Sequence, residues 1–177
     1  MNELPLNFIF ECFDVLPNGI LQWKTRPLHH FKDDSDQRRW NTRYAGTEAG
    51  SPNSDGHLKV QLTFVGKTQF VFAHRIVWAL TESAWPTRQL DHKNRIKSDN
   101  RRLNLRLATP TQNNQNQTMQ KNNTSGFKGA SKNGDRWMAS IRVEGKKINL
   151  GRYSTPEEAS EVYRLAAEKY HGLFACT

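Results

Sequence analysis

The sequence has few of the features that mark secreted, zinc-binding or membrane proteins. Its two cysteines, Cys12 and Cys176, lie near opposite ends of 177 residues without a CxxC spacing, which excludes a disulfide framework and a cysteine zinc pair. No basic stretch followed by an apolar run opens the chain, and no window approaches about 18 continuous apolar residues. We therefore expect a cytoplasmic protein that holds no zinc and does not bind or cross a membrane.

Acidic residues are scarce relative to basic ones, and the imbalance is confined to one half of the chain. The net charge is +9, from 26 Lys and Arg against 17 Asp and Glu. Residues 1–90 hold 10 basic and 9 acidic residues, whereas residues 91–177 hold 16 and 8. An evenly basic surface would only favour solubility. Charge concentrated in the second half favours a polyanionic partner such as nucleic acid.

Aromatic residues indicate a folded chain in spite of its low hydrophobicity. Only 36% of the residues are apolar and the mean hydropathy is −0.81, but five Trp, nine Phe and four Tyr argue against disorder. Alternating apolar residues predict hairpins over 8–24 and 58–72, and the spacing changes to a short apolar helix over 74–81. Residues 25–56 show no regular pattern. We therefore expect small cores in a polar protein.

A second unit is predicted after a polar linker at residues 118–125. Three strand-like runs follow the linker, at 127–131, 136–143 and 146–152. An amphipathic helix then begins at Pro156 and ends at Gly172. This pattern predicts the α+β class, with a small three-stranded antiparallel sheet packed on one helix over residues 126–177.

A further pair of strands is interrupted by basic residues. Leu90-Asp91 predicts a brief strand and Leu103, Leu105 and Leu107 predict its partner, so residues 93–102 must form a loop. The capping sequence at Thr109 predicts a helix over 110–118. Strand, loop, strand and helix therefore follow one another within about 30 residues.

Oxygen ligands for a metal ion are predicted at the ends of these elements. If the helix packs across the strands, Asp91 and Asn113 converge, and their oxygens suit Mg²⁺ or Mn²⁺ rather than zinc. Two protein ligands leave positions for water and a phosphate oxygen. If the strand breaks at His92, its imidazole can take a proton from the attacking water. Asn100 and Asn104 are expected to tie the loop to its own backbone.

Each of these residues also has an ordinary explanation. An Asp-His pair is commonly a surface turn or a hydrogen-bonded core pair, and an Asn-rich stretch such as 113–116 is commonly a solvated helix surface. The order of the elements and the flanking arginines favour the catalytic interpretation. Among the remaining histidines, we expect His29 and His30 in an exposed linker, His57 and His171 at the surface or in packing, and His74 capping or packing its helix.

The longer motifs resemble those of phage and intron-encoded HNH homing endonucleases. The segments that carry the resemblance are His74-Arg75-Ile76-Val77-Trp78, Leu90-Asp91-His92, Asp99-Asn100-Arg101, Asn104-Leu105-Arg106-Leu107-Ala108-Thr109 and Gln112-Asn113. The resemblance implies a ββα-metal nuclease domain over residues 1–117, with its core at 74–117. It implies His92 as general base, Asp91 and Asn113 as ligands of Mg²⁺ or Mn²⁺, and Asn104 as the catalytic-loop brace.

Two positions depart from the usual pattern of these endonucleases. The third motif position is Asn113 where many relatives have His, which resembles the His-Asn-Asn variants, and Arg95 stands where relatives often have Gly or Asp. The basic residues of this domain that we expect on DNA are Arg95, Arg101, Arg102 and Arg106.

The basic C-terminal segment resembles the APETALA-type (ethylene-response-factor) DNA-binding domain. The segments that carry this resemblance are Gly126-Phe127-Lys128-Gly129, Trp137-Met138-Ala139-Ser140-Ile141, Asn149-Leu150-Gly151-Arg152-Tyr153, Glu157-Glu158-Ala159 and Tyr163 with Ala166-Ala167 and His171-Gly172. A twisted sheet of this kind can lie in a DNA major groove. We expect DNA contacts from Lys128, Arg136, Trp137, Arg142, Lys147 and Arg152. A basic solvent face over a small core, with Trp137 buried, is the alternative.

Together these features predict a site-selective, homing-endonuclease-like enzyme that cleaves phosphodiester bonds in double-stranded DNA. The resemblance implies 5′-phosphate and 3′-hydroxyl ends and a bacterial or phage-infected host cell. One active site per chain predicts nicking by a monomer, and cutting both strands needs a weak homodimer or sequential events. A DNA-binding regulator with a decayed nuclease site and an RNA-binding protein are the alternatives. The combination of Asp91, His92, Asn104 and Asn113 favours the enzyme.

Overall fold

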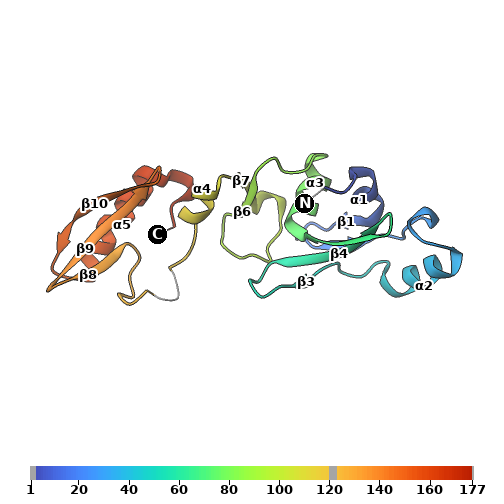
Figure 1. Ribbon diagram of the computed structural model, residues 1–177, viewed down its shortest axis with the longest axis horizontal. Helices are drawn as coiled ribbons and strands as arrows, with labels where there is room; N and C mark the ends of the chain where they lie inside the picture. The colour runs from blue at the N-terminus through green and yellow to red at the C-terminus, as the bar shows by residue number, and fades with distance from the viewer. Residues whose placement is uncertain (1–2, 120–122, 177) are drawn as a thin grey trace. The chain divides into compact units, whose positions relative to one another are not determined.

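The computed structural model describes residues 3–119 and 123–176, which form two compact units (Figure 1). The first unit spans residues 1–107 and the second spans 108–177. Each unit combines helices with antiparallel strands, as the α+β class requires. The expected linker falls inside the second unit, and its residues 120–122 lie outside the described residues. None of the described helices has the length and hydrophobicity that a bilayer crossing requires.

The first unit consists of short helices around small sheets. In chain order its elements are α1 (Leu6–Cys12), β1 (Phe13–Val15), β2 (Leu21–Trp23), η1 (Leu28–His30), α2 (Asp34–Tyr44), β3 (Ser51–Pro52), β4 (Leu58–Phe64), β5 (Lys67–Phe72), α3 (Ala73–Glu82), β6 (Gln89–His92), η2 (Arg102–Asn104) and β7 (Leu105–Ala108). Strands β1 and β2 pair, β3, β4 and β5 form a sheet in that order, and β6 pairs with β7. The expected hairpin over 58–72 and helix over 74–81 are therefore confirmed.

The core of this unit lies between α3, α1 and the sheets. Ile76 and Val77 of α3 are fully buried and pack in one cluster with Ile9 of α1, Leu62 of β4 and Leu105 of β7. Leu90, next to Asp91, belongs to the same cluster. Burying apolar surface stabilises the fold by about 25 cal/mol per Å². The strand that carries Asp91 and His92 is therefore anchored in the main core of its unit.

Two predictions for the N-terminal half are wrong. Residues 6–12 form a helix and not the first strand of a hairpin, because Phe8, Ile9 and Cys12 follow helical spacing and pack into the core on one face. Residues 25–56, expected to be irregular, contain α2, whose N-terminus is capped when the Asp33 side chain accepts a hydrogen bond from the Asp36 N–H at 2.9 Å. Helix α2 was missed because its sequence has no strong apolar stripe, and in the structure it buries no residue fully.

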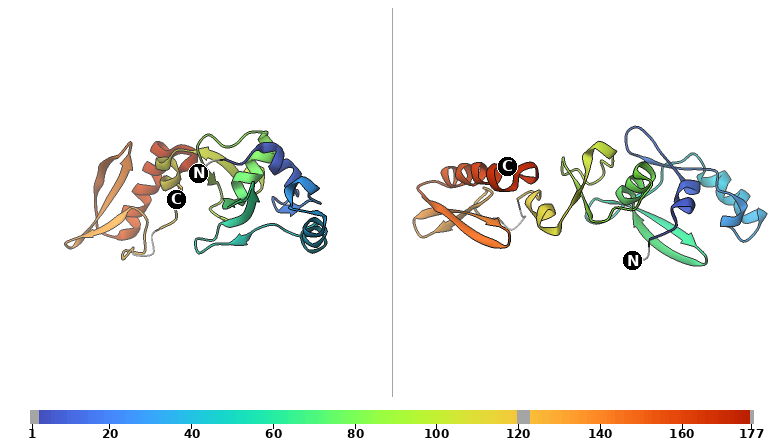
Figure 2. Two further views of the ribbon diagram at one scale, coloured as in Figure 1. Left: turned by 45° about the vertical axis from the view of Figure 1, so that its right-hand side comes forward. Right: turned by 90° about the horizontal axis from the view of Figure 1, so that it is seen from above.

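The second unit is a three-stranded sheet with a long helix on one side, preceded by a short helix. Its elements are α4 (Pro110–Gln115), β8 (Ala130–Asn133), β9 (Arg136–Val143), β10 (Lys146–Tyr153), α5 (Pro156–His171) and η3 (Gly172–Phe174). The strands lie in the order β10-β9-β8 with antiparallel pairing, and α5 lies along one side of them (Figure 2). The capping boxes at Thr109 and Thr155 are both formed. Helix α4 is shorter than the expected 110–118 and ends at Gln115.

Candidate active site

Asp91 and His92 are the last two residues of β6, and both are buried. The strand continues through His92 rather than breaking at it, and the chain turns immediately afterwards. The His92 carbonyl accepts a hydrogen bond from the Arg95 N–H at 2.9 Å, and the Lys93 N–H donates to the Asn104 carbonyl at 2.9 Å. The pair therefore stands where a strand buried in the core passes into the polar loop.

The His92 ring is oriented by Asn100, a contact that the sequence did not predict. His92 Nε2 lies 3.0 Å from Asn100 Oδ1, and Asn100 is only 2% exposed. A carboxamide oxygen can only accept, so this bond places the imidazole proton on Nε2 and the lone pair on Nδ1. Asn100 was expected to bind the loop backbone, and it instead fixes the tautomer of the candidate base.

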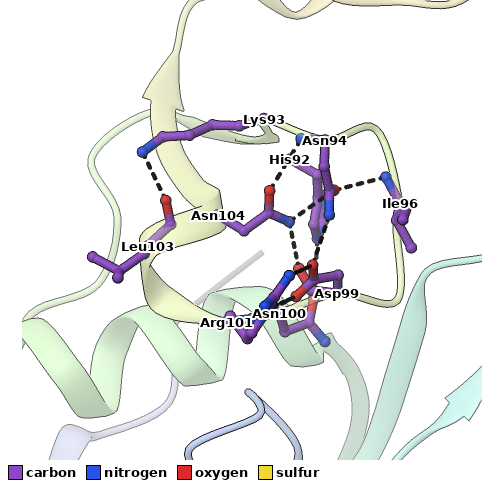
Figure 3. A network of polar contacts seen from close by, with 9 residues as sticks. All are labelled: His92, Lys93, Asn94, Ile96, Asp99, Asn100, Arg101, Leu103 and Asn104. Atoms are coloured by element: carbon purple, nitrogen blue, oxygen red, sulfur yellow. Dashed lines mark hydrogen bonds and ion pairs between the residues drawn. The ribbon is translucent and has the colours of Figure 1, made fainter.

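Asn104 braces the loop, as predicted, and Figure 3 shows its amide between Asn94 and Asp99. Asn104 Nδ2 donates to Asn94 Oδ1 at 2.9 Å and to the Asp99 carbonyl at 2.7 Å. Its Oδ1 accepts from the Asn94 N–H at 3.0 Å. Leu103 was expected in the second strand. It lies instead in η2, the 3-10 turn that positions Asn104, and its side chain is 86% exposed.

Three of the four arginines expected on DNA in this unit pair with carboxylates. Arg101 Nη2 lies 2.6 Å from Asp99, and hydrogen bonds from Arg101 lower the pKa of Asp99 to about 2. Arg102 Nε lies 2.6 Å from Glu82, and its guanidinium lies 3.9 Å from the centre of the Trp78 ring. These contacts tie the loop to itself and to α3, which gives Arg101 and Arg102 a structural role.

Arg106 binds the candidate metal ligand itself. Its Nη2 and Nε lie 2.6 Å and 2.7 Å from Oδ2 of Asp91, which is buried, while Arg106 is partly buried. An ion pair with two short hydrogen bonds of this kind fixes the direction of the carboxylate. Arg106 therefore holds Asp91 in position, and the expectation that it contacts DNA stays a prediction. Arg95 is exposed and adopts a φ of 65°, the left-handed conformation for which Gly is favoured.

Asn113 lies in the second unit, on α4. Its N–H donates to the Thr109 carbonyl at 2.9 Å, in the first turn of the helix. The Thr109 capping box holds that turn, since the Thr109 hydroxyl accepts from the Gln112 N–H at 3.2 Å. The position of Asn113 on its helix is therefore fixed by local sequence.

A turn far away in the sequence supports the loop. Gly19, in the β1–β2 turn, has a φ of 82°, and a Cβ built there would lie 2.2 Å from the Arg101 nitrogen and 2.5 Å from the Asn100 carbonyl carbon. Only a glycine lets the turn approach the loop backbone this closely. Asn18-Gly19 lies inside the hairpin predicted over residues 8–24, but nothing in the sequence indicated this contact.

Replacing Gly19 with alanine should lower the free energy of unfolding by about 2–4 kcal/mol, from the left-handed conformation and the clash together. Gly56→Ala is the matched control, because Gly56 has a φ of 84° with no atom within 4 Å of its added Cβ. Urea unfolding measures both. Equal losses would show that the contact with the Asn100–Arg101 backbone contributes nothing.

The histidines at positions 29 and 30 are not linker residues. His30 is buried, and its Nε2 lies 2.7 Å from Oε2 of Glu11. The Arg26 Nε donates to His30 Nδ1 at 3.1 Å. The expected exposure holds for His29 but is wrong for His30, because α2 and η1, absent from the prediction, fold this segment onto α1.

The sheet of the second unit has one basic face. Ala139 and Ile141 of β9 pack in clusters with residues of α5, so the alternate positions Arg136 and Arg142 point to the opposite face. In the antiparallel register Arg142 is opposite Lys147 and Met138 is opposite Arg152. We call Arg136, Arg142, Lys147 and Arg152 the basic sheet face; all four are exposed.

Two residues expected at a DNA interface do not lie on this face. Trp137 packs against Ala130, Ala139 and Ala159 on the side covered by α5, because it is one residue out of phase with Arg136. Lys128 Nζ donates to the carbonyls of Gln117 at 2.6 Å and Cys176 at 2.9 Å. Lys128 therefore closes the unit internally, and the expected DNA contacts of Trp137 and Lys128 stay predictions.

Comparisons with known proteins find one family model that covers Asp91 and His92, and two curated relatives. Residues 71–115 match the family model of the HNH endonucleases. The chain is 34% identical over 113 residues to an uncharacterized HNH endonuclease of Acanthamoeba polyphaga mimivirus, covering 63% of this chain and 57% of that protein. It is 40% identical over 74 residues to Protein 3.8 of Escherichia phage T7, covering 41% of this chain and 60% of that protein.

The chain is also similar to a solved structure of the HNH homing endonuclease I-HmuI, which is described for its DNA binding and cleavage. The match covers 90% of this chain and 85% of the I-HmuI chain. The identity is 19% and the TM-score is 0.42. The chain spans less than two thirds of the length of the curated relatives that it matches. The segment that matches the HNH endonuclease family model, residues 71–115, contains Asp91, His92, Asn100, Asn104 and Asn113.

Proposed function

We propose that this protein is a metal-dependent DNA endonuclease in which His92 is the general base. The observation that carries the proposal is the 3.0 Å contact of His92 Nε2 with the buried Asn100 amide, inside the segment that matches the HNH endonucleases. A base needs its lone pair at a fixed position, and this contact leaves the lone pair on Nδ1. A decayed site in a DNA-binding regulator would have no need for this arrangement.

Asp91 and Asn113 are the proposed ligands of one Mg²⁺ or Mn²⁺ ion. A carboxylate and a carboxamide offer hard oxygen donors, which suit these ions and not zinc. Arg106 fits this role for Asp91, because it binds Oδ2 and sets the direction of the carboxylate. When bound, the ion would stabilise negative charge on the scissile phosphate and the leaving oxygen.

Each of the other residues would then have a separate role in hydrolysis. His92 accepts the proton of the attacking water, Asn100 keeps its ring in one tautomer, and Asn104 holds the loop that carries Asn100. Arg95 is exposed on the same loop, where a cation would attract the phosphate backbone. The basic sheet face would anchor the enzyme on double-stranded DNA and supply site selectivity, as the APETALA-type resemblance implies.

Metal removal tests the proposal directly. The purified full chain should convert supercoiled plasmid to the nicked form with Mg²⁺ or Mn²⁺, and excess EDTA should abolish nicking until the metal is restored. Asn113→Ala should lower the rate and raise the metal concentration needed, whereas Asn114→Ala, one position along α4, should behave as wild type. We expect the Asn113 loss to be about 10–100-fold or more, since even supporting residues of metal sites cost that much.

The proposal fails if plasmids of several sequences, including the DNA around the protein's own gene, stay supercoiled under all these metal conditions. DNA binding without nicking would support the regulator. Preferential binding of RNA over duplex DNA would support the RNA-binding alternative.

A further inference from the structure

Three histidines from separate elements meet beside the candidate base. His57 precedes β4, His74 is in the first turn of α3, and His92 ends β6. Their ring centres lie 5.4 Å apart for His57 and His74, 5.7 Å for His57 and His92, and 5.2 Å for His74 and His92. One nitrogen from each ring lies within 4.8 Å of the others. Three imidazoles that converge in this way can hold a metal ion.

His74 carries a polar atom that no described residue satisfies. The residue is 8% exposed, and within residues 3–119 and 123–176 its buried Nδ1 has no hydrogen-bond partner. Buried polar groups are normally paired, so an orphaned nitrogen inside a histidine cluster needs an explanation. Helix capping does not supply it, because the N-terminus of α3 has no side-chain cap. A ligand that accepts a nitrogen lone pair would satisfy it.

The cluster is suited to a neutral, metal-binding state. Burial, with further contributions from His92 and His57, lowers the pKa of His74 to about 3. Burial, Lys97 and His92 lower the pKa of His57. Metal ions bind the deprotonated ring, so these directions favour ligation at neutral pH. Within this set the donors are three nitrogens, which suit Zn²⁺, Cu²⁺, Ni²⁺ or Co²⁺ rather than Mg²⁺.

We propose that His57, His74 and His92 form a binding site for one late transition-metal ion of the Zn²⁺ class, separate from the Mg²⁺ ligands Asp91 and Asn113. Zn–N bonds are about 2.0–2.1 Å, so the rings must close slightly around the ion. Three histidines leave a fourth position for water. The original expectation that the protein holds no zinc is replaced by this proposal.

The site would act as an inhibitory switch, a consequence that rests on the proposed function. A neutral imidazole has one lone pair, so His92 cannot bind an ion and accept the proton of water at the same time. Zn²⁺ at the cluster would therefore stop hydrolysis while the Mg²⁺ ligands and the basic sheet face stay intact.

A second group of possible ligands must be separated from this one. Glu11, His29 and His30 also bring three donor atoms together. Their atoms are already engaged, with Glu11 Oε2 at 2.9 Å from His29 and 2.7 Å from His30. This group therefore lacks the unsatisfied nitrogen of the first cluster, and it provides the control.

The test is calorimetric titration of the EDTA-treated full chain with Zn²⁺ alone. His57→Phe keeps a ring against Phe72 but removes the nitrogen, and His29→Phe removes a donor of the other group. We expect one Zn²⁺ site in the wild type and in His29→Phe, with affinity at least about 100-fold weaker in His57→Phe. Zn²⁺ should raise the melting temperature of the wild type and His29→Phe only.

Three results would overturn the site: no Zn²⁺ binding by the wild type, unchanged binding in His57→Phe, or loss of binding in His29→Phe. If His57→Phe does not fold, as circular dichroism would reveal, His57→Gln serves in its place. Nicking assays add a separate arm, in which Zn²⁺ inhibits the Mg²⁺ reaction of the wild type and His57→Phe resists it. If the wild type binds Zn²⁺ as expected but never nicks DNA, the proposed function fails while the metal site stands.

Discussion

Replacing His92 with alanine should lower the rate of Mg²⁺-dependent nicking by about 10²–10⁴-fold, the usual contribution of a positioned general base. The variant removes the imidazole that holds its lone pair on Nδ1, and no other described residue makes the same contact with Asn100. Binding to duplex DNA should be nearly unchanged, because His92 is buried and carries no phosphate contact of its own in the proposed arrangement. Rates from single-turnover plasmid nicking and affinities from a binding titration measure the two effects separately.

His29→Ala is the matched control for this experiment, because it removes a histidine of the same unit outside the loop. It should nick at the wild-type rate. Asn100→Ala should give an intermediate loss of about 10–100-fold, as for residues that orient a functional histidine. Equal nicking by the wild type and His92→Ala, with both folded, would remove His92 from the mechanism and leave the proton to another group.

The core of the site could be predicted from the sequence because its elements are local. The strand at Leu90, the loop after His92 and the cap at Thr109 are set by alternation and capping residues within about 30 positions. The brace by Asn104 follows from the same short segment. The resemblance to HNH endonucleases added the roles, and the family match at 71–115 supports the same segment.

The features that sequence reasoning missed depend on contacts across long separations. Gly19 meets the Asn100–Arg101 backbone from more than 80 positions away, and His57 and His74 reach His92 from other elements. The partner of Asn100 was also misassigned, because an Asn in a polar loop ordinarily binds nearby backbone. Tertiary packing alone decides which of these side chains meet.

The alternation of side chains along a strand explains why Trp137 does not lie on the basic sheet face. Positions 136–143 were correctly predicted as a strand, yet Trp137 was expected on the same face as Arg136 and Arg142. Adjacent strand residues point to opposite faces, so the three cannot share one. Trp137 lies on the face covered by α5, because it packs with Ala139 and Ala159 under the helix. The basic sheet face is left with four cations and no aromatic residue from β9.

Neutralising the basic sheet face should have the largest effect on DNA affinity. The variant Arg136→Gln, Arg142→Gln, Lys147→Gln and Arg152→Gln removes four positive charges from one exposed surface. If each residue contacts a phosphate, the slope of log affinity against log salt should fall by about 0.9 per residue, close to four in total. The affinity at low salt should also fall by about 10³-fold or more. Fluorescence anisotropy with a labelled duplex across several salt concentrations measures the slope.

A control with the same change in net charge separates position from charge. Lys132, Lys146, Arg164 and Lys169 lie on the helix-covered side of the sheet or on α5 itself, and the four Gln substitutions there also remove four charges. This control should weaken binding only through the long-range field, which salt screens beyond about 10 Å at 0.1 M, and should keep the wild-type slope. If both variants lose the same slope, the face opposite α5 does not contact DNA and the charge acts only in bulk. If only the first loses it, the basic sheet face is the surface that holds the nuclease on its substrate.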